Sequence, residues 1–200
     1  MSDVNPTRSA VLELQDERRA MHEGYVFLDE KCLLLAGEML RQLEVHGRLQ
    51  RRLQALHGQA AAALAAAVAR HGLHGLQVYP PIDLSGASVP VRARSLMGVR
   101  LQEASLDAGD AQADAAVDAS PEAEACRRAY GAVLALAVEV AAVTGNLERL
   151  SLEYRRSVRR ARALQDVMLP ELDHTIADID GRLEEAERED AIWMRRGALG

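Results

Sequence analysis

The sequence predicts an all-α protein: a long antiparallel two-helix coiled coil formed by N- and C-terminal helices, with a small irregular middle insertion that has room for a short β-hairpin. In two long segments, apolar residues recur at alternating intervals of four and three, which is the pattern of a coiled-coil seam. Aromatic residues make up 3% of the chain against 48% hydrophobic residues, and alanine and leucine dominate, as in long helices. Glycine and proline gather between the two segments.

The N-terminal helix is expected over residues 5–71. Asn5 can cap it, and Pro6 suits the first helical position, where a missing N–H costs nothing. The helix should end near Gly72, because glycine suits a C-terminal cap. Its predicted seam comprises Val11, Leu14, Arg18, Met21, Tyr25, Leu28, Cys32, Leu35, Met39, Gln42, His46, Leu49, Leu53, Leu56, Ala60 and Ala63. A second apolar line is predicted to widen the buried face through Phe27, Leu34, Leu40 and Leu43.

The middle segment, residues 72–119, reads as an insertion between the helices. Glycine, proline and serine punctuate it. Residues 89–91 and 96–99 favour short strands. The stretch 103–124 holds seven acidic residues and no basic one, so we expect residues 103–119 to form an acidic mobile loop that buries little apolar surface.

The C-terminal helix is expected over residues 120–196. Ser120 can cap it and Pro121 can open it. Pro170 should bend this helix rather than end it, because the apolar pattern continues on both sides. Its predicted seam comprises Cys126, Tyr130, Val133, Ala137, Val140, Thr144, Leu147, Ser151, Tyr154, Val158, Ala161, Gln165, Met168, Leu172, Thr175, Ile179, Arg182 and Ala186. Each helix would reach on the order of 100 Å.

An antiparallel pair within one chain is the natural way to cover both seams, because the linker is long enough to turn back. In such a pair, facing residue numbers sum to about 200 if the chain ends lie together. That register keeps Cys32 and Cys126 far apart, so no disulfide is expected between them.

Motifs of enzymatic chemistry are missing from the sequence. It contains no phosphate-binding GxxxxGK[ST] loop, no HExxH and no CxxC, and His71 and His74 have no nearby cysteine or carboxylate to complete a metal site. We therefore expect no catalytic, cofactor or metal site. The net charge of −6 argues against nucleic acid as a partner. Glu139 interrupts the longest apolar run and no signal peptide is visible, which favours a cytoplasmic chain that does not insert into a membrane.

A basic band is the sharpest charge feature of the chain. The band comprises Arg155, Arg156, Arg159, Arg160 and Arg162. It can be a solvated helix face, or a contact surface for an acidic partner. RNA binding is a third reading, but Tyr154 is the only aromatic residue beside the arginines that could stack on a base.

Three blocks of the sequence have a familiar order and spacing. Residues 5–8 (NPTR) open a leucine-rich helix that runs into residues 24–31 (GYVFLDEK), and residues 95–99 read SLMGV. The most specific block is residues 159–170, RRARALQDVMLP. Over nearly its whole length the chain resembles the D subunit of the V/A-type rotary ATPases and ATP synthases. Ala161, Arg162 and Gln165 depart from the Val, Asn and Glu that are usual in that family.

The resemblance implies a non-catalytic central rotor shaft. Such a shaft stands in the bore of a hexamer of catalytic A and B subunits, binds the small F subunit on its side, and rests on the funnel-shaped subunit of the membrane ring. It transmits torque for ATP synthesis or for ATP-driven proton or sodium transport, and it is cytoplasmic and peripheral to the membrane. Under this reading, the basic band and Met168 serve partner contact and torque.

Two other readings remain on the residues alone. A cytoplasmic coiled-coil scaffold or tether with no role in rotation would have the same periodicity, and only the three blocks argue against it. A helical-bundle enzyme is the third reading, and it is disfavoured because no convergent set of titratable groups stands out in the sequence.

Overall fold

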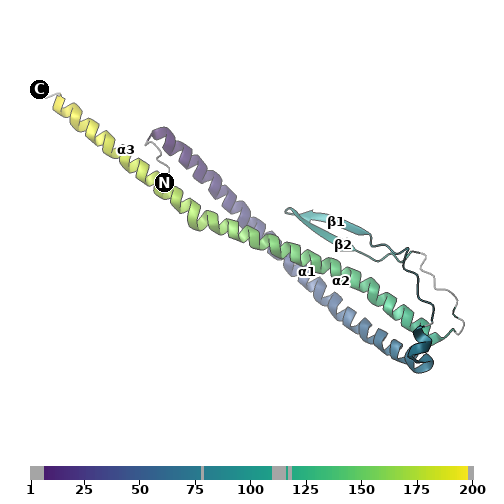
Figure 1. Ribbon diagram of the computed structural model, residues 1–200. Helices are drawn as coiled ribbons and strands as arrows, with labels where there is room; N and C mark the ends of the chain where they lie inside the picture. The colour runs from purple at the N-terminus through teal and green to yellow at the C-terminus, as the bar shows by residue number, and fades with distance from the viewer. Residues whose placement is uncertain (1–6, 78, 110–115, 117–118, 198–200) are drawn as a thin grey trace. The chain divides into compact units, whose positions relative to one another are not determined.

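A computed structural model describes residues 7–77, 79–109, 116 and 119–197. Its elements follow the order α1 (Arg8–Gln77), β1 (Val91–Leu96), β2 (Val99–Ala104), α2 (Pro121–Ala163), η1 (Leu164–Met168) and α3 (Leu169–Gly197) (Figure 1). The chain divides into two compact units. Unit 1 combines residues 1–34 with 154–200, and unit 2 comprises residues 35–153. The predicted fold class, two long helices and a hairpin between them, is confirmed.

Helix α1 begins after a threonine cap. Thr7 Oγ1 accepts a hydrogen bond from the Ala10 N–H at 3.1 Å, which satisfies one of the free donors of the first turn. The predicted start at Asn5 and Pro6 lies outside the described residues. Near the other end, Gly72 adopts a left-handed φ of 68° and interrupts the helical backbone, as expected for a glycine that stops a helix. Residues 73–77 form one further short turn of helix.

In each unit the helices run antiparallel. In unit 1, Arg8 pairs with Glu187 and Arg18 with Asp173, so the facing residue numbers sum to 195 and 191. In unit 2, Arg70 lies 3.5 Å from Glu122, a sum of 192. The predicted sum of about 200 is therefore close to the observed register. Cys32 in unit 1 and Cys126 in unit 2 are both free thiols.

The seam of α1 is as predicted along most of its length. Val11, Cys32, Leu35 and Ala60 are buried, and most of the residues between them on the seam are half-buried. The second apolar line is a wrong prediction: Phe27, Leu34, Leu40 and Leu43 are each more than half exposed. Periodicity placed these four residues on one side of the helix but could not show whether another element covers that side.

A tight hairpin occupies the middle of unit 2. Strands β1 and β2 pair antiparallel from Val91↔Ala104 to Leu96↔Val99. The two-residue turn between them is Met97–Gly98, and both residues have positive φ (48° and 84°), as the twist of a two-residue hairpin requires. Residues 96–99 were predicted as a strand, but they span this turn.

The acidic segment begins inside the hairpin. Glu103 and Ala104 belong to β2, and Asp107 exchanges backbone hydrogen bonds with Ser88 at 2.8 and 2.9 Å. The prediction of a mobile loop from residue 103 onward is therefore wrong for residues 103–107, because antiparallel pairing satisfies their backbone groups. Residues 110–115, 117 and 118 of that prediction lie outside the described part of the chain.

Helix α2 starts where the sequence predicts. Pro121 is its first residue, and Ser120 Oγ accepts the Ala123 N–H at 3.1 Å. By length and composition alone, the continuous helix Pro121–Arg196 could cross a membrane, with a window of 18 residues whose mean hydropathy is 1.5 and of which 11% is buried. A single helix of this kind is weak support for a membrane span, since apolar helices of soluble proteins pass the same test.

Pro170 does not end the helical segment of unit 1. Leu164–Met168 form a π-helical turn (η1), and the Leu169 N–H donates to the Leu164 carbonyl, five residues back. A proline has no N–H to give to the carbonyl four residues before it, and its ring collides with that carbonyl in a regular α-helix. The wider turn directly before Pro170 relieves this conflict, and α3 continues to Gly197.

The π-turn corrects part of the predicted seam. Gln165 and Met168, both predicted to face the partner helix, are exposed, Met168 at 39%. Leu164 and Leu169 are half-buried in their place. Because a π-turn adds one residue to the helical repeat, it shifts the inward positions that regular spacing predicts.

Candidate assembly surfaces

A buried carboxylate anchors the hairpin to α1 in unit 2. The Glu38 side chain is 4% exposed, and it accepts hydrogen bonds from Arg94 of β1 at 2.5 Å, from Gln42 at 2.8 Å, and from Arg41. Burial by itself raises the pKa of Glu38, but the hydrogen bonds from Gln42 and Arg94 and the charges of Arg94 and Arg41 outweigh it. The net effect is a pKa below the usual value for a glutamate.

An asparagine of α2 binds the outer edge of β2. Backbone hydrogen bonding alternates along a hairpin, so the N–H and C=O of Gln102 point away from β1. The Gln102 N–H donates to Asn146 Oδ1 at 2.7 Å, and Asn146 Nδ2 donates to the Gln102 carbonyl at 2.8 Å. Arg149 extends this edge by donating to the Arg100 carbonyl at 2.9 Å and to Asn146 Oδ1 at 2.7 Å. The side chains of α2 therefore do what a third strand would do.

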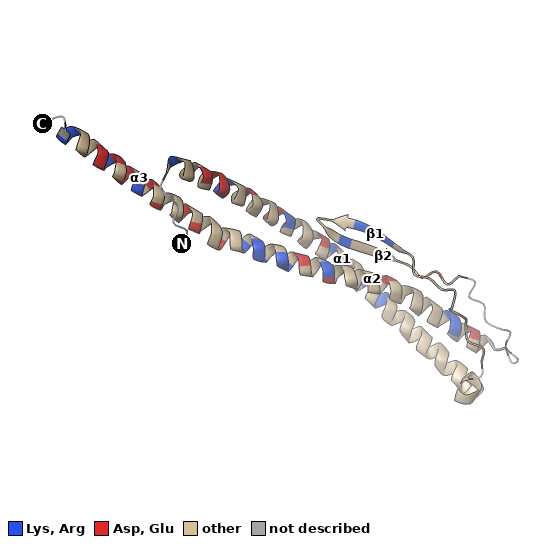
Figure 2. Cartoon of the chain, turned by 45° about the horizontal axis from the view of Figure 1, so that its top comes forward, with Lys and Arg blue, Asp and Glu red and all other residues tan. Residues whose placement is uncertain are grey.

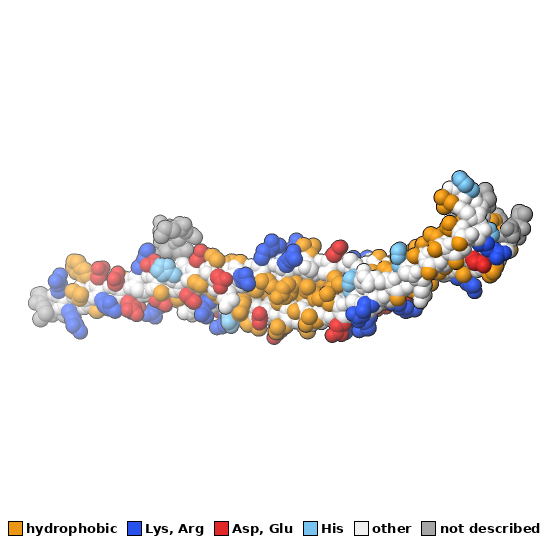
Figure 3. Space-filling model, turned by 90° about the horizontal axis from the view of Figure 1, so that it is seen from below, with side chains coloured by type: hydrophobic (Ala, Val, Ile, Leu, Met, Phe, Trp, Pro, Cys, Tyr) orange, Lys and Arg blue, Asp and Glu red, His pale blue; other side chains and the backbone are white. Residues whose placement is uncertain are grey.

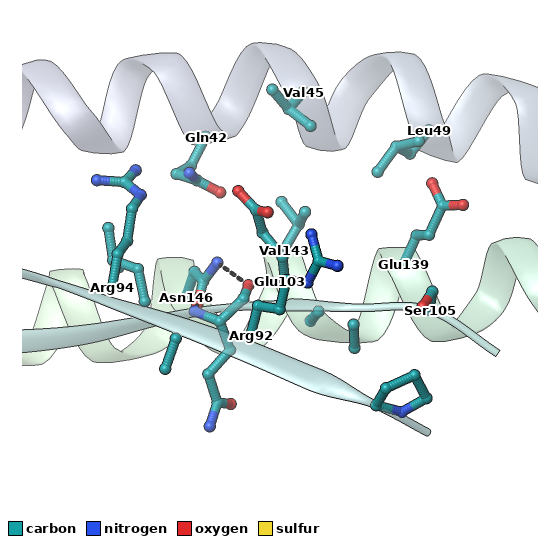
Figure 4. Close-up of a pocket in the computed structure, with 16 residues that line it drawn as sticks. Gln42, Val45, Leu49, Arg92, Arg94, Glu103, Ser105, Glu139, Val143 and Asn146 are labelled. Atoms are coloured by element: carbon teal, nitrogen blue, oxygen red, sulfur yellow. Dashed lines mark hydrogen bonds between the residues drawn. The ribbon is translucent and has the colours of Figure 1, made fainter. Parts of the chain in front are cut away.

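A groove of about 710 Å³ lies between the hairpin and the two helices of unit 2. Figure 4 shows Gln42, Val45 and Leu49 reaching into it from α1, and Glu139, Val143 and Asn146 lining it from α2. The hairpin contributes Arg92 and Glu103, among others. The lining mixes apolar side chains with charges of both signs, and we find no convergent set of groups suited to catalysis.

A polar cluster closes the end of unit 2 where the chain turns back. His71 Nε2 and Ser120 Oγ lie 2.6 Å apart, in hydrogen-bond contact. The Arg127 guanidinium stands 4.5 Å from the centre of the Tyr79 ring, in a cation–π arrangement, and it also donates to the Pro80 carbonyl. These contacts join both ends of the insertion to the helices. Among the described residues no group of three or more histidines, cysteines or carboxylates is arranged to bind a metal ion.

The basic band lies in unit 1 on the exposed side of α2. Its five arginines, Arg155, Arg156, Arg159, Arg160 and Arg162, are all exposed, and they appear as the run of blue on α2 in Figure 2. In the described part of the chain, no carboxylate lies within 4 Å of Arg155, Arg159, Arg160 or Arg162 to form an ion pair. The structure brings these residues together as predicted from spacing. Met168 is also exposed, on the π-turn that follows α2.

Large apolar side chains remain uncovered along α1. Val26, Phe27, Leu33 and Leu34 of unit 1 are between 41% and 69% exposed, and so are Leu40 and Leu43 of unit 2. Figure 3 shows apolar side chains at the surface, with clusters of basic side chains beside them. Exposed apolar residues in such number are typical of a chain that is covered by partner proteins.

The residues that hold the hairpin were not foreseen from the sequence. Glu38, Asn146 and Arg149 bind residues that lie 44 to 56 positions away in the sequence, and no local spacing marks such contacts. One weak signal existed: Glu38 is an acidic residue beside the apolar seam positions Leu35 and Met39, and a buried carboxylate needs a partner.

Comparison with known proteins gives a consistent match. The sequence model of the family described as the D subunit of ATP synthase matches residues 10–196. The D subunit of the A-type ATP synthase of Methanopyrus kandleri is 28% identical over 98% of this chain and 86% of its own length. The corresponding D subunit of the V-type ATP synthase of Thermotoga neapolitana is 25% identical over 96% of each chain, and that of the A-type enzyme of Thermococcus gammatolerans is 28% identical over 97% of this chain and 92% of its own. With its two long helices and the match along nearly all of its length, the chain belongs to the family of ATP synthase D subunits.

Proposed function

We propose that this chain is the non-catalytic central shaft of a V/A-type rotary ATPase or ATP synthase. The observation that carries the proposal is the family match over residues 10–196, which spans both long helices and the hairpin between them. As the shaft, the chain transmits torque between the ion-translocating membrane ring and a hexamer of catalytic A and B subunits. The F subunit and the funnel-shaped subunit on the ring are its other partners.

The physical task of such a shaft is coupling between sites. A shaft without threefold symmetry favours a different state at each of three catalytic interfaces, and its rotation changes which interface is open. A pair of long helices suits this task, because its backbone hydrogen bonds run along the direction in which it must be stiff. The nucleotide chemistry then belongs to the A and B subunits.

The basic band and Met168 are the proposed contacts with the surrounding hexamer. Four of the five arginines have no carboxylate partner within the described chain, so an acidic lining can attract them without first breaking an internal ion pair. Met168, six residues after Arg162, offers an exposed, adaptable apolar side chain.

The exposed apolar surface of the helices is proposed to face protein rather than lipid. Glu139 lies in the apolar part of α2 and is exposed, and a charged side chain inside a bilayer is costly. The chain is then peripheral to the membrane, on its cytoplasmic side, and held there by the complex.

Reconstitution tests the proposal. The full chain is combined with A and B subunits, and ATP hydrolysis and rotation of a bead on the chain are recorded. We expect the chain to complete the hexamer and to rotate during hydrolysis. A chain that neither binds the hexamer nor turns would contradict the shaft and favour the scaffold.

A triple variant tests the basic band within the same assay. Arg155→Gln, Arg159→Gln and Arg162→Gln together should weaken assembly at low salt, while helicity stays unchanged. The matched control is Arg48→Gln, Arg51→Gln and Arg52→Gln, which removes the same charge from three exposed positions of α1. Equal behaviour of the two triple variants would show that the band is only a solvated face.

A further inference from the structure

The π-turn of unit 1 changes which residues face α1. Inward positions on this helix are Ala161, Leu164, Leu169, Leu172 and Ile179, all buried or half-buried. The interval between Leu164 and Leu169 is five residues, where a regular seam has three or four. Five is also the hydrogen-bond period of the π-turn, which the bond from the Leu169 N–H to the Leu164 carbonyl shows directly.

The same sequence also supports a second arrangement. The regular alternation of four and three runs unbroken through Ala161, Gln165, Met168, Leu172, Thr175 and Ile179. An α-helical turn would therefore place Gln165 and Met168 inward and move Leu164 and Leu169 outward. Both arrangements share Ala161, Leu172 and Ile179. Beyond the turn they differ in phase, because the π register turns Ile176 and Leu183 inward, where the regular spacing predicts Thr175 and Arg182.

We propose that Leu164–Met168 is a register switch, a π-turn that can exchange with an α-turn and so swap the Leu164/Leu169 pair for the Gln165/Met168 pair against α1. This inference concerns the chain itself and does not depend on the proposed function.

Pro170 selects the π-turn. In an α-turn the proline ring would collide with the Asp166 carbonyl and leave it without its usual donor. The π-turn avoids the collision, and it inserts two leucines rather than a glutamine and a methionine. No residue of Leu164–Met168 is fully buried, so the turn itself loses little packing in the exchange.

Gly24 of α1 makes the two registers distinguishable. A Cβ atom built on Gly24 would lie 3.8 Å from Leu164 Cδ1, which is an ordinary contact. A cysteine at position 24 therefore fits without displacing its neighbours. It would face position 164 in the π register and position 165 in the α register.

Disulfide trapping in the full chain is the test, in a background that carries Cys32→Ala and Cys126→Ala. The two pairs are Gly24→Cys with Leu164→Cys, and Gly24→Cys with Gln165→Cys. We expect the pair with position 164 to oxidise faster in the parent. Pro170→Ala should lower the ratio of the two rates by on the order of 10- to 100-fold, because alanine is much better tolerated than proline inside an α-helix.

Single-residue deletions give a second readout that needs no cysteine. Deleting Gln165 removes the extra residue of the π-turn. Leu164 and Leu169 then lie four residues apart, which is a regular α-helical interval. The melting temperature of this variant should therefore stay close to that of the parent. Deleting Ala177, an exposed residue of α3, is the control and should melt lower, because it moves Ile179 off the inward face.

Several results would overturn the switch. One is an unchanged rate ratio in Pro170→Ala, and another is a loss of helical circular dichroism in that variant. A third is an equal loss of melting temperature for the two deletions. A ratio that falls by on the order of tenfold or more in Pro170→Ala, together with tolerance of the Gln165 deletion, supports it.

Discussion

The two units hold a helix pair in different ways. In unit 2 the hairpin adds a third layer, and Leu35, Leu101 and Leu150 are fully or almost fully buried. Unit 1, in its described residues, has a pair of helices and no strand, and its most buried apolar side chains are Ile179 at 3% and Val11 at 7% exposure. We expect the hairpin layer to make unit 2 the more stable of the two units, because it lets larger apolar side chains be buried there.

The largest expected effect tests the buried core of unit 2. Leu150→Ala should lower the free energy of unfolding of the full chain by about 3 kcal/mol, because the residue is 0% exposed. Leu152→Ala is the matched control two residues away, 68% exposed, and should cost less than about 0.5 kcal/mol. Guanidinium unfolding followed by circular dichroism measures both. Equal losses of unfolding free energy in the two variants would show that Leu150 is not part of a packed core.

The next effect tests the ion cluster that joins the hairpin to α1. Glu38→Gln should cost about 1–2 kcal/mol, less than a fully buried pair, because Arg94 keeps 44% of its side chain exposed to solvent. Glu44→Gln, an exposed change of the same kind on α1, should be nearly neutral. If the two variants lose the same free energy of unfolding, the ion cluster around Glu38 does not stabilise unit 2.

The same cluster predicts a pH dependence. The pKa of Glu38 is lowered in the folded chain, so the carboxylate contributes stability that is present above its unfolded value of 4.5 and is lost as the pH falls through the folded value. The difference in stability between the parent and Glu38→Gln should therefore shrink as the pH is lowered below about 4.5. Unfolding curves of both proteins at pH 7, 5, 4 and 3 check this. A stability difference between the parent and Glu38→Gln that grows as the pH falls would contradict the prediction.

A smaller, local effect tests the edge of β2. Asn146→Ala leaves the Gln102 N–H and C=O without their partner, at a cost of about 1–2 kcal/mol. Hydrogen exchange at the Gln102 amide should accelerate by about tenfold or more. Glu148→Ala, between Asn146 and Arg149, is the control, and similar protection in both variants would mean that the edge is held by other contacts.

The smallest effect is expected in unit 1. Arg18→Gln breaks the pair with Asp173, whose two side chains are each about half exposed, and should cost less than about 1 kcal/mol. The loss should shrink further in high salt, because exposed charges are screened. If Arg18→Gln loses as much free energy of unfolding as Glu38→Gln, the proposed difference in stability between the units is wrong.

Local signals in the sequence were reliable predictors. The cap at Ser120, the start at Pro121 and the seam of α1 each depend on neighbours within a turn or two, and each is found in the structure. The stop at Gly72 belongs to the same class, since glycine adopts the required left-handed backbone without a steric cost.

Errors arose where the outcome depends on distant or competing groups. The exposure of Phe27 and Leu34 depends on what covers α1, which periodicity does not contain. Met168 left the seam because Pro170 demands a wider turn than regular spacing allows. Glu38 and Asn146 were missed as anchors, since their partners are joined to them only by the folded chain.

The hairpin has one guarded edge and one open edge. Asn146 and Arg149 bind the outer edge of β2. The two-stranded sheet ends at β1 on its other side, where the backbone N–H and C=O groups of Ala93 and Ser95 point outward. An open strand edge is a template on which a second molecule can add, and it is a common origin of aggregation. Arg92 belongs to this strand and is exposed, so two copies that pair antiparallel through the edge bring like charges together. Concentrated preparations should therefore remain dispersed best at low ionic strength, where this mutual repulsion is least screened.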